Sequence, residues 1–312
     1  MRNSLPPAVF IMGPTATGKT DLAMRLCDEF PFEIVSVDSA LIYRDMDIGT
    51  AKPSADTLER YPHRLVNILD PAEVYSAAQF RSDALSAMDL ISKKGKVPLL
   101  VGGTMLYFRA LQHGLSVLPE SDANVRTALQ LRLETEGLEV LHEQLRKVDP
   151  QAATRIHPND PQRILRALEV YELAGEPLSY ILARQPDATL DYRILKLVLW
   201  AEKRDILHTR IANRFDHMLE QGFVDEVERL RTRGDLDLDK PSMRAVGYRQ
   251  VWQYLDGDMN KNEMRERGVI ATRQLAKRQT TWLRSEIECQ RIDFETVSYE
   301  RVVADVGAWL AK

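Results

Sequence analysis

The sequence predicts an α/β fold in which a parallel sheet core is flanked by helices and carries an inserted all-helical domain. Three observations support this fold class. Short β-rich runs are apolar throughout instead of alternating, which is typical of strands buried on both faces of a parallel sheet. Longer segments with helical periodicity separate these runs, and a glycine-rich loop directly follows the first run. The strand pattern disappears over the middle of the chain and then returns.

The composition narrows the class of protein. The chain has 312 residues, enough for about two domains. It is 44% hydrophobic and 28% charged, which excludes a disordered chain. Its net charge of -4 excludes a protein that coats nucleic acid through a uniformly basic surface. Any binding to nucleic acid therefore has to come from local clusters of basic residues.

Cysteine usage and hydropathy indicate a compartment. The two cysteines, Cys27 and Cys289, are far apart and lack CxxC spacing. We therefore expect neither a disulfide framework nor a structural zinc site, which fits a reducing cytoplasm. No stretch approaches the ~20 apolar residues of a membrane span, so the prediction is a cytoplasmic protein without a membrane partner.

The predicted strands are five short apolar runs, and one crossover helix is clear between them. The predicted strands cover residues 9–12, 34–37, 98–101, 194–200 and 291–293. The helix begins after Ser76, because Ser76 and Gln79 have the spacing of a capping box. Apolar residues from Ala77 to Ile91 then recur at helical spacing.

The middle of the chain lacks any strand pattern from about Pro119 to Gln185. One helix in it is well delimited: Asp160 is a good N-cap, Pro161 suits the first helical position, and Gly175 ends the helix. We therefore expect the middle to be an insertion between two parts of the sheet.

The predicted organisation has two domains. Residues 1–118 and 190–312 form the α/β core, whose C-terminal part after residue 203 is mostly helical. Residues 119–189 form the helical insertion.

The glycine-rich loop matches the phosphate-binding pattern G-x-x-x-x-G-K-[ST]. It follows a predicted strand and opens a helix, which is the context that this motif requires. Its backbone N–H groups can surround phosphate oxygens, Lys19 adds a positive charge, and the Thr20 hydroxyl can reach Mg²⁺. The predicted phosphate-binding residues are Gly13, Pro14, Thr15, Ala16, Thr17, Gly18, Lys19 and Thr20. The sheet core is thus of the P-loop NTPase-like kind, and the motif indicates a polyphosphate without specifying ATP.

Asp38 directly follows the second predicted strand. Ligands of open α/β sheets bind at the carboxyl ends of the strands, so Asp38 can be a general base or a magnesium ligand. It can equally be the N-cap of a helix starting at Ser39, and its position alone favours neither role. A conventional nucleotidase also carries an acid after a later strand to hold magnesium, whereas here that strand ends Val101-Gly102-Gly103-Thr104. The missing acid argues against an ordinary ATPase.

Thr104 has two interpretations as well. It can donate a hydrogen bond to a bridging phosphate oxygen at the same sheet edge. By itself, however, the pattern favours a tight turn with Thr104 as the cap of a helix over Met105–Leu111.

A basic segment lies near the C-terminus of this acidic chain. Lys261–Arg284 contains seven basic residues and two acids. Arg273, Lys277 and Arg284 share one helical face, and Trp282 can stack on a base or simply pack. Such stripes are usually solvated, but the excess of charge makes binding to RNA phosphates an equally good interpretation.

Two smaller basic features accompany this segment. Arg244–Arg249 contains a second basic-aromatic pair, and Arg163 and Arg166 lie three apart on the inserted helix. The histidines show no metal-ligand spacing.

Together these residues resemble the tRNA dimethylallyltransferase family over nearly the whole chain. The resemblance is carried by residues 13–20, 37–43, 47–53, 101–107, 159–169, 244–249 and 277–284. A phosphate-binding loop is shared by many families, but Asp47–Pro53 and Lys277–Arg284 are far more specific.

The resemblance implies a reaction and its partners. A dimethylallyl group is transferred from dimethylallyl diphosphate to N6 of the adenosine just 3′ of the anticodon, in tRNAs reading codons that begin with U, and diphosphate is released. The implied partners are the anticodon stem-loop of tRNA and dimethylallyl diphosphate, with Mg²⁺ as cofactor and a monomeric enzyme.

The resemblance also implies site residues. The implied tRNA contacts are Asp38, Ser39, Ala40, Leu41, Thr104, Arg126, Gln162, Arg163, Ile164, Leu165, Arg166, Arg244, Ala245, Val246, Gly247, Tyr248, Arg249, Lys277, Arg278, Gln279, Thr280, Thr281, Trp282, Leu283 and Arg284. Thr104 matches the family's transition-state stabiliser, and Arg214 matches an arginine near the diphosphate. Many relatives have Gln where this chain has Ala40 and Gly where it has Asp45, so no base-reading amide is expected at Ala40.

The predicted mechanism uses three catalytic residues, Asp38, Thr104 and Lys19. Lys19 and a magnesium ion at Thr20 neutralise the leaving diphosphate, which Thr104 contacts at its bridging oxygen. Asp38 orients the adenine amine and accepts its proton. The base has to leave the anticodon-loop stack to reach them.

Two other function classes remain possible at this point. The hypothesis of a P-loop kinase that acts on a small metabolite explains the phosphate-binding loop and the fold, but it gives no function to the basic Lys277–Arg284 helix. A non-catalytic RNA-binding regulator would use the loop as a sensor, and Asp38→Ala would then leave every activity unchanged.

Overall fold

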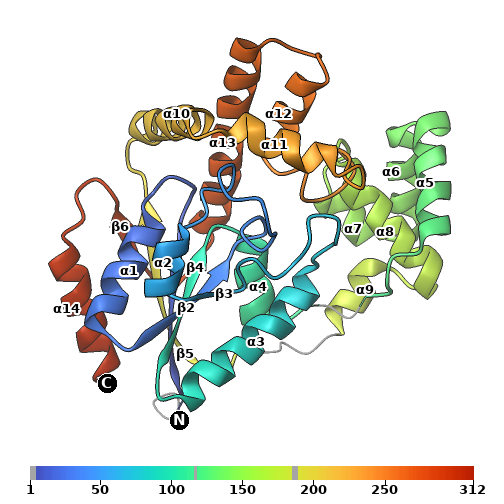
Figure 1. Cartoon of the computed structure of the whole chain (residues 1–312). Coiled ribbons are helices and arrows are strands. Elements are labelled where there is room, and N and C mark those ends of the chain that lie inside the picture. Colours follow the sequence, from blue (N-terminus) through green and yellow to red (C-terminus); the bar gives the residue numbers. More distant parts are fainter. Residues whose placement is uncertain (1–4, 116–117, 185–188) are drawn as a thin grey trace. The chain divides into compact units, whose positions relative to one another are not determined.

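The computed structural model describes residues 5–115, 118–184 and 189–312. Its centre is a six-stranded sheet with the order β3-β2-β4-β1-β5-β6, and every neighbouring pair is parallel (Figure 1). The strands are β1 (Pro7–Met12), β2 (Phe32–Val37), β3 (His63–Arg64), β4 (Val97–Gly102), β5 (Arg193–Trp200) and β6 (Cys289–Asp293). The predicted α/β class and all five predicted strands are confirmed. Strand β3 was not predicted because two residues do not form an apolar run.

Helices cover both faces of this sheet. Helices α1 (Lys19–Glu29) and α14 (Tyr299–Leu310) pack on one face, where Val9 and Ile11 point. Helices α3 (Ala77–Lys93) and α4 (Met105–His113) pack on the other face, against Phe10 and Met12. Successive residues of β1 thus point to opposite buried faces, which explains why the run is apolar throughout. The capping box predicted at the start of α3 is present.

The chain divides into two compact units, one comprising residues 1–112 and 190–312 and the other residues 113–189. The second unit is helical where described, so the middle of the chain carries no strand there. It contains α5 (Ala123–Glu136), α6 (Leu138–Val148), α7 (Pro150–Arg155), α8 (Pro161–Ala174) and α9 (Leu178–Ala183), around a small apolar core of its own. Asp160 caps α8, and Gly175 ends it in a left-handed conformation, as predicted.

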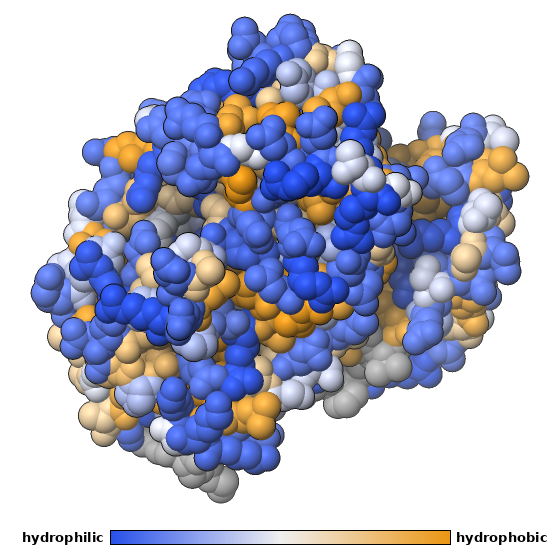
Figure 2. Space-filling view, in the orientation of Figure 1, coloured by the Kyte–Doolittle hydropathy of each residue, from blue (hydrophilic) through white to orange (hydrophobic). Residues whose placement is uncertain are grey.

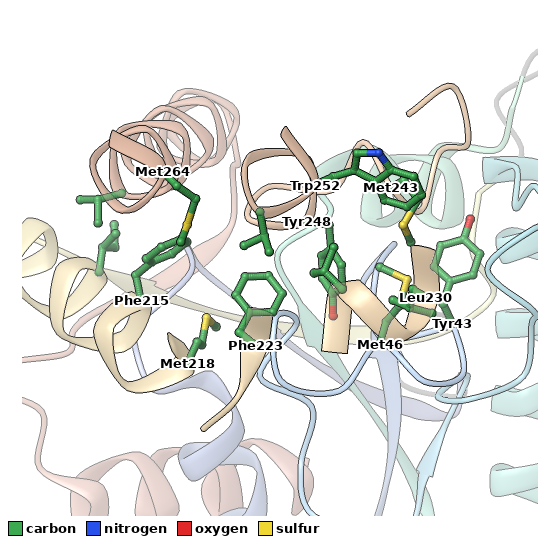
Figure 3. Packing of buried hydrophobic residues seen from close by; sticks show 14 of the residues in the cluster. Tyr43, Met46, Phe215, Met218, Phe223, Leu230, Met243, Tyr248, Trp252 and Met264 are labelled. Atoms are coloured by element: carbon green, nitrogen blue, oxygen red, sulfur yellow. The ribbon is translucent and has the colours of Figure 1, made fainter. Parts of the chain in front are cut away.

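A second apolar layer in the larger unit joins the helices between β5 and β6. They are α10 (Arg204–Glu220), α11 (Phe223–Thr232), α12 (Tyr248–Leu255) and α13 (Lys261–Arg284); the short α2 (Ala55–Arg60) lies earlier in the chain. Figure 3 shows the rings of Phe223 and Tyr248 side by side in this layer, with Met218 and Met46 on either side. The two ring centroids are 5.0 Å apart in an edge-on arrangement, a favourable geometry for aromatic pairs.

The surface seen in Figure 2 is largely hydrophilic, with apolar side chains gathered in limited patches. Among the described residues, every helix is too short or too polar to cross a membrane.

Gly102 provides a test of the sheet packing. A Cβ there would lie 2.0 Å from the carbonyl oxygen of Val37, which is backbone and cannot move aside. We expect Gly102→Ala to lower the free energy of unfolding by about 2–3 kcal/mol, as overpacked cores do. Urea denaturation measures this change. In the matched control Gly307→Ala, the added methyl meets Phe30 at an ordinary 3.5 Å within α14, so about 0.5–1 kcal/mol of stabilisation is expected. Equal effects of the two substitutions would contradict the packing.

Candidate active site

The carboxyl ends of three strands are in register at one edge of the sheet. Met12 of β1 pairs with Gly102 of β4, and Gly102 pairs with Val37 of β2. The loops that begin at Gly13, Asp38 and Gly103 therefore start side by side. A cavity of about 190 Å³ opens at this edge. Its lining comes from the following residues, which lie on loops, at the end of β4 and on α1, α10, α12 and α13: Thr15, Ala16, Lys19, Thr20, Asp38, Ala40, Leu41, Gly49, Thr50, Ala51, Val101, Gly102, Gly103, Ile211, Arg214, Phe215, Met218, Ala245, Val246, Gly247, Tyr248, Thr272, Leu275 and Gln279.

The predicted phosphate-binding loop connects β1 to α1. Gly18 has φ +83° and precedes α1 without a capping side chain, so the first N–H groups of this helix have no side-chain acceptor at the cap. The Thr17 hydroxyl and the Lys19 ammonium both donate to the carbonyl oxygen of Pro14, at 2.8 and 2.7 Å. Thr15, Ala16, Lys19 and Thr20 line the cavity, whereas Gly13, Pro14, Thr17 and Gly18 shape the loop behind it. The loop thus presents positive potential to an anion.

Two cations and one carboxylate dominate the electrostatics of the cavity. The pKa of Lys19 is lowered to about 8, chiefly by burial and to a lesser extent by the nearby Arg214, while the carboxylate of Asp38 opposes both. Burial also lowers the pKa of Arg214, again opposed by Asp38. The Arg214 guanidinium donates to the Thr15 hydroxyl and to the carbonyl of Thr50, each at 3.2 Å. A dianionic or trianionic ligand would relieve the repulsion between the two cations.

Asp38 lies in a turn and does not start a helix, so its interpretation as a helix N-cap is wrong. Its Oδ1 accepts the backbone N–H of Ala40 at 2.8 Å and that of Leu41 at 3.4 Å. These bonds fix the carboxylate at the cavity wall through one oxygen. The second oxygen, Oδ2, takes no part in them and can face a ligand.

Thr104 precedes α4, but its side chain does not cap that helix. Its Oγ1 accepts the backbone N–H of Ser39 at 3.1 Å, while its backbone N–H donates to Val37 at 3.2 Å. Thr104 is therefore a link between the β4 loop and the Asp38 turn. It stands just outside the residues that line the cavity.

Gln279 of α13 joins two loops of the site. Its Oε1 accepts the backbone N–H of Thr15 at 2.9 Å, and its Nε2 donates to the carbonyl of Gly103 at 2.9 Å. Side-chain amides can accept and donate at once, which suits this bridge. The resemblance assigned Gln279 to RNA, but in the structure its amide is engaged with protein backbone.

The segment 244–249 contributes its inner part to the cavity. Ala245, Val246 and Gly247 line it, and the buried Tyr248 donates its hydroxyl to Glu226 at 2.6 Å. Arg244 and Arg249 are exposed outside it.

The predicted basic stripe lies on the face of α13 that points away from the cavity. Residues 277 and 279 are about 200° apart around a helix, and Gln279 points to the catalytic cavity. Lys277, Arg273 and Arg284 instead line a groove of about 500 Å³ together with Arg204. The groove also contains Trp200 and a single carboxylate, so cations outnumber acids there. Among the described residues, Nε of Arg273 is buried without a hydrogen-bond partner.

The predicted tRNA contacts of the second unit divide into exposed and buried residues. Arg126, Gln162 and Arg163 are exposed, and Arg163 pairs with Asp160 at 3.3 Å. Arg166 pairs with Glu169 at 2.7 Å, and a second bond from its guanidinium holds the carbonyl of Pro119. Arg163 and Arg166 therefore have separate acidic partners.

Three predicted RNA contacts are corrected by the structure. Ile164, Tyr248 and Leu283 are 0%, 0% and 1% exposed, and each belongs to an apolar core. Their side chains cannot reach RNA, because a motif read as a continuous segment includes the residues on the inward face of its helix. Leu165 is partly buried against the same core as Ile164.

Several residues of the site were not predicted. Residues 49–51 line the cavity, and their segment matched the family without an assigned role. Glu226 and the apolar wall on α10 had no recognisable sequence pattern. Asp45, where relatives have Gly, has φ +64°, a conformation that favours Gly and tolerates Asp.

Comparison with known proteins agrees with this geometry. A model of the IPP transferase family matches residues 41–286, and an isopentenyl transferase model matches residues 7–68. The chain belongs to the IPP transferase family.

Three crystal structures show the same fold. The tRNA isopentenylpyrophosphate transferase of Bacillus halodurans is 35% identical, with a TM-score of 0.70 and coverage of 98% of this chain and 95% of that one. The tRNA delta(2)-isopentenylpyrophosphate transferase of Staphylococcus epidermidis is 32% identical, with a TM-score of 0.71 and coverage of 98% and 99%. A eukaryotic dimethylallyltransferase acting on tRNA is 27% identical, with a TM-score of 0.83 and coverage of 98% and 80%.

The lowered pKa of Lys19 predicts a pH dependence of anion binding. A bound anion favours the charged form of the Lys19 ammonium. In the free protein this group begins to lose its proton near pH 8, so above that pH anion binding is accompanied by uptake of a proton by Lys19. The affinity for inorganic diphosphate should therefore fall as the pH rises above about 8, by at most about tenfold per pH unit. Titration calorimetry in buffers of different ionisation enthalpy measures the proton uptake. Lys19→Arg should keep binding but lose this part of the pH dependence, because Arg does not titrate in the range. The same pH profile in both proteins would contradict the assignment.

Proposed function

We propose that this chain is a tRNA dimethylallyltransferase, which transfers the dimethylallyl group of dimethylallyl diphosphate to N6 of the adenosine 3′-adjacent to the anticodon. The tRNAs concerned read codons that begin with U. The observation that carries this proposal is one cavity with a cationic phosphate end, a carboxylate, and an apolar wall. Lys19 and Arg214 form the cationic end, and Asp38 supplies the carboxylate. Ile211, Phe215 and Met218 give the apolar wall that an isoprenoid chain requires.

The diphosphate is the leaving group, so catalysis depends on stabilising its growing charge. The N–H groups at the start of α1, Lys19 and Arg214 are held in place before the reaction, so they need no reorganisation as the carbon–oxygen bond breaks. Thr15 and Gln279 hold the loop itself. In this structure Thr104 supports the Asp38 turn, and in the reaction its hydroxyl would contact the bridging oxygen of the diphosphate.

Asp38 acts on the nucleophile. The adenine amine is weakly nucleophilic because its lone pair is shared with the ring. The carboxylate of Asp38 would accept a hydrogen bond from the amine, orient it toward the allylic carbon and take its proton as the new bond forms. The two backbone bonds to Oδ1 keep this carboxylate from rotating away.

Mg²⁺ fits the donors at the phosphate end. Thr20 and Asp38 line the same cavity, and among the described residues there is no cluster of three or more His, Cys, Asp or Glu side chains. Magnesium commonly binds through one or two protein oxygens and keeps substrate phosphates and waters as its other ligands. Bound at Thr20, it would supply further neutralisation of the diphosphate charge.

RNA binding is proposed in both units, each described by itself. The larger unit offers the 244–249 segment and the groove of Arg273, Lys277 and Arg284, and the smaller unit offers Arg126 and the start of α8. Local cationic clusters suit phosphate contacts in a chain whose net charge is -4. We propose that the enzyme acts as a monomer.

The direct test is incubation of the protein and Mg²⁺ with unmodified tRNA and labelled dimethylallyl diphosphate, followed by nucleoside mass analysis. A gain of one dimethylallyl group on adenosine is expected. Asp38→Asn should lower the rate by about 10²–10⁴-fold, the usual contribution of a general base. Asp45→Asn is the matched control, because Asp45 is exposed and Asn tolerates its positive φ. Consumption of ATP with a small acceptor and no change of tRNA would instead indicate a kinase.

The basic groove predicts the salt dependence of RNA binding. Replacing Lys277 and Arg284 with Gln should weaken tRNA binding and reduce the slope of log K against log salt by about 1 for each lost phosphate contact. Filter binding at several salt concentrations measures the slope. Lys93→Gln is the control, since Lys93 is an exposed cation on α3 that is paired with Asp89. Equal slopes for both variants and the wild type would exclude the groove from RNA contact.

A further inference from the structure

The segment Asp47–Pro53 carries one of the most specific family resemblances, yet no step of the proposed mechanism uses it. In the structure it is a loop of turns between β2 and α2, and Gly49, Thr50 and Ala51 line the catalytic cavity. A loop without ladder hydrogen bonds needs partners elsewhere for its backbone N–H groups. Those partners therefore decide the shape of this side of the cavity.

One buried carboxylate receives the first three of these N–H groups, whereas those of Ala51 and Lys52 donate to carbonyls within the loop. Oε2 of Glu226, on α11, accepts the backbone N–H of Asp47 at 3.0 Å and that of Ile48 at 2.7 Å. Oε1 accepts the N–H of Gly49 at 3.1 Å and the hydroxyl of Tyr248 at 2.6 Å. Glu226 is 3% exposed. Four donors fill the acceptor positions of one carboxylate, and none of them carries a charge.

The chemistry of this contact requires a carboxylate. Burying a negative charge is costly unless hydrogen bonds satisfy its lone pairs. The buried charge of Glu226 is therefore explained by the donors that it binds. Three successive N–H groups pointing at one anion form a concave binding site made by the loop backbone. A glutamine of the same shape has only one acceptor oxygen. Its NH₂ group would face N–H or O–H donors, from which it cannot accept a hydrogen bond.

The loop is held at two further places. The Lys52 ammonium donates to Asp47 at 2.6 Å and to the carbonyl of Tyr43 at 2.7 Å, and its side chain is 1% exposed. At Gly49, a Cβ would lie 2.1 Å from Phe223 and 2.6 Å from Tyr248, so the loop backbone rests directly on these rings. Both rings belong to the apolar layer of Figure 3.

The loop in turn holds Arg214, the arginine proposed to bind the diphosphate. The carbonyl of Thr50 accepts a hydrogen bond from one NH₂ group of Arg214, and the other NH₂ group donates to Thr15 of the phosphate-binding loop. Displacing Thr50 would free Arg214 to rotate about its long side chain. A guanidinium contributes to anion binding only while its donors are correctly oriented.

We propose that Glu226 is a positioning residue for the reaction: it holds the Asp47–Pro53 loop so that Thr50 orients Arg214 toward the diphosphate. This inference rests on the proposed function, because Arg214 acts there on a prenyl diphosphate. It also explains the family-specific segment, whose Asp47, Gly49, Thr50 and Lys52 each have a contact in this arrangement.

The test compares Glu226→Gln with Glu228→Gln, an exposed residue on the same helix. Glu226→Gln should raise KM for dimethylallyl diphosphate by about 10–100-fold, equivalent to one charge-assisted hydrogen bond, with a smaller change in KM for tRNA. Glu228→Gln should behave like the wild type. Thermal unfolding is followed in parallel. A lower Tm with both KM values unchanged would show that Glu226 serves only the fold and would overturn the proposal.

A double-mutant cycle with Arg214→Lys tests whether Glu226 acts through Arg214. If it does, Glu226→Gln should raise KM by less than about twofold in the Arg214→Lys background. Fully additive effects would overturn the proposal. Should Glu226→Gln fail to fold, Tyr248→Phe removes a single donor from the carboxylate and should raise the same KM by a smaller factor; an unchanged KM in that variant counts against the proposal.

Titration with inorganic diphosphate and Mg²⁺ separates this proposal from the function on which it rests. If wild-type protein modifies no tRNA but Glu226→Gln weakens diphosphate binding, the positioning role stands and the proposed reaction is wrong. If wild-type protein modifies tRNA and Glu226→Gln binds diphosphate normally, the positioning role is wrong and the reaction stands.

Discussion

The register of β1, β4 and β2 is the constraint on which the site depends. Because Met12, Gly102 and Val37 are aligned, the phosphate-binding loop, the Gly103 turn and the Asp38 turn begin at one sheet edge. The strands approach so closely there that a Cβ on Gly102 would overlap the carbonyl of Val37. A slip of one residue would reverse the direction of each side chain and separate the three loops. The placement of the catalytic residues at this edge therefore depends on how closely the strand backbones pack.

Charges in the cavity are held by neutral groups, which leaves them free to act on a ligand. Lys19 donates to a carbonyl, Arg214 donates to a hydroxyl and a carbonyl, and Asp38 accepts backbone N–H groups. In the described part of the chain, none of these three side chains forms a close ion pair. Such an arrangement costs stability, as seen in the lowered pKa of Lys19, and it prepares the site for a highly charged anion.

Helix α13 serves two surfaces because its residues point in opposite directions. Gln279 bridges Thr15 and Gly103 on the catalytic side, whereas Lys277 and Arg284 line a basic groove on the other side. The motif that was read as one RNA-binding segment thus contains a bridge within the active site, a buried core residue at Leu283, and exposed cations. A periodicity of 3.6 residues separates these roles within eight positions.

Features that depend on a local pattern of residues could be predicted from the sequence. The apolar runs, the phosphate-binding loop, the capping box at Ser76 and the helix from Asp160 to Gly175 could all be predicted, because neighbouring residues specify them. Contacts between residues far apart in the chain are known only from the three-dimensional structure. Gln279 reaches Thr15 across 264 positions, and Glu226 reaches Asp47 across 179. The three-dimensional structure also shows that burial lowers the pKa of Lys19 and that Asp38 lies in a turn instead of starting a helix. Such contacts and fields have no local pattern, since they arise from packing between elements far apart in the chain.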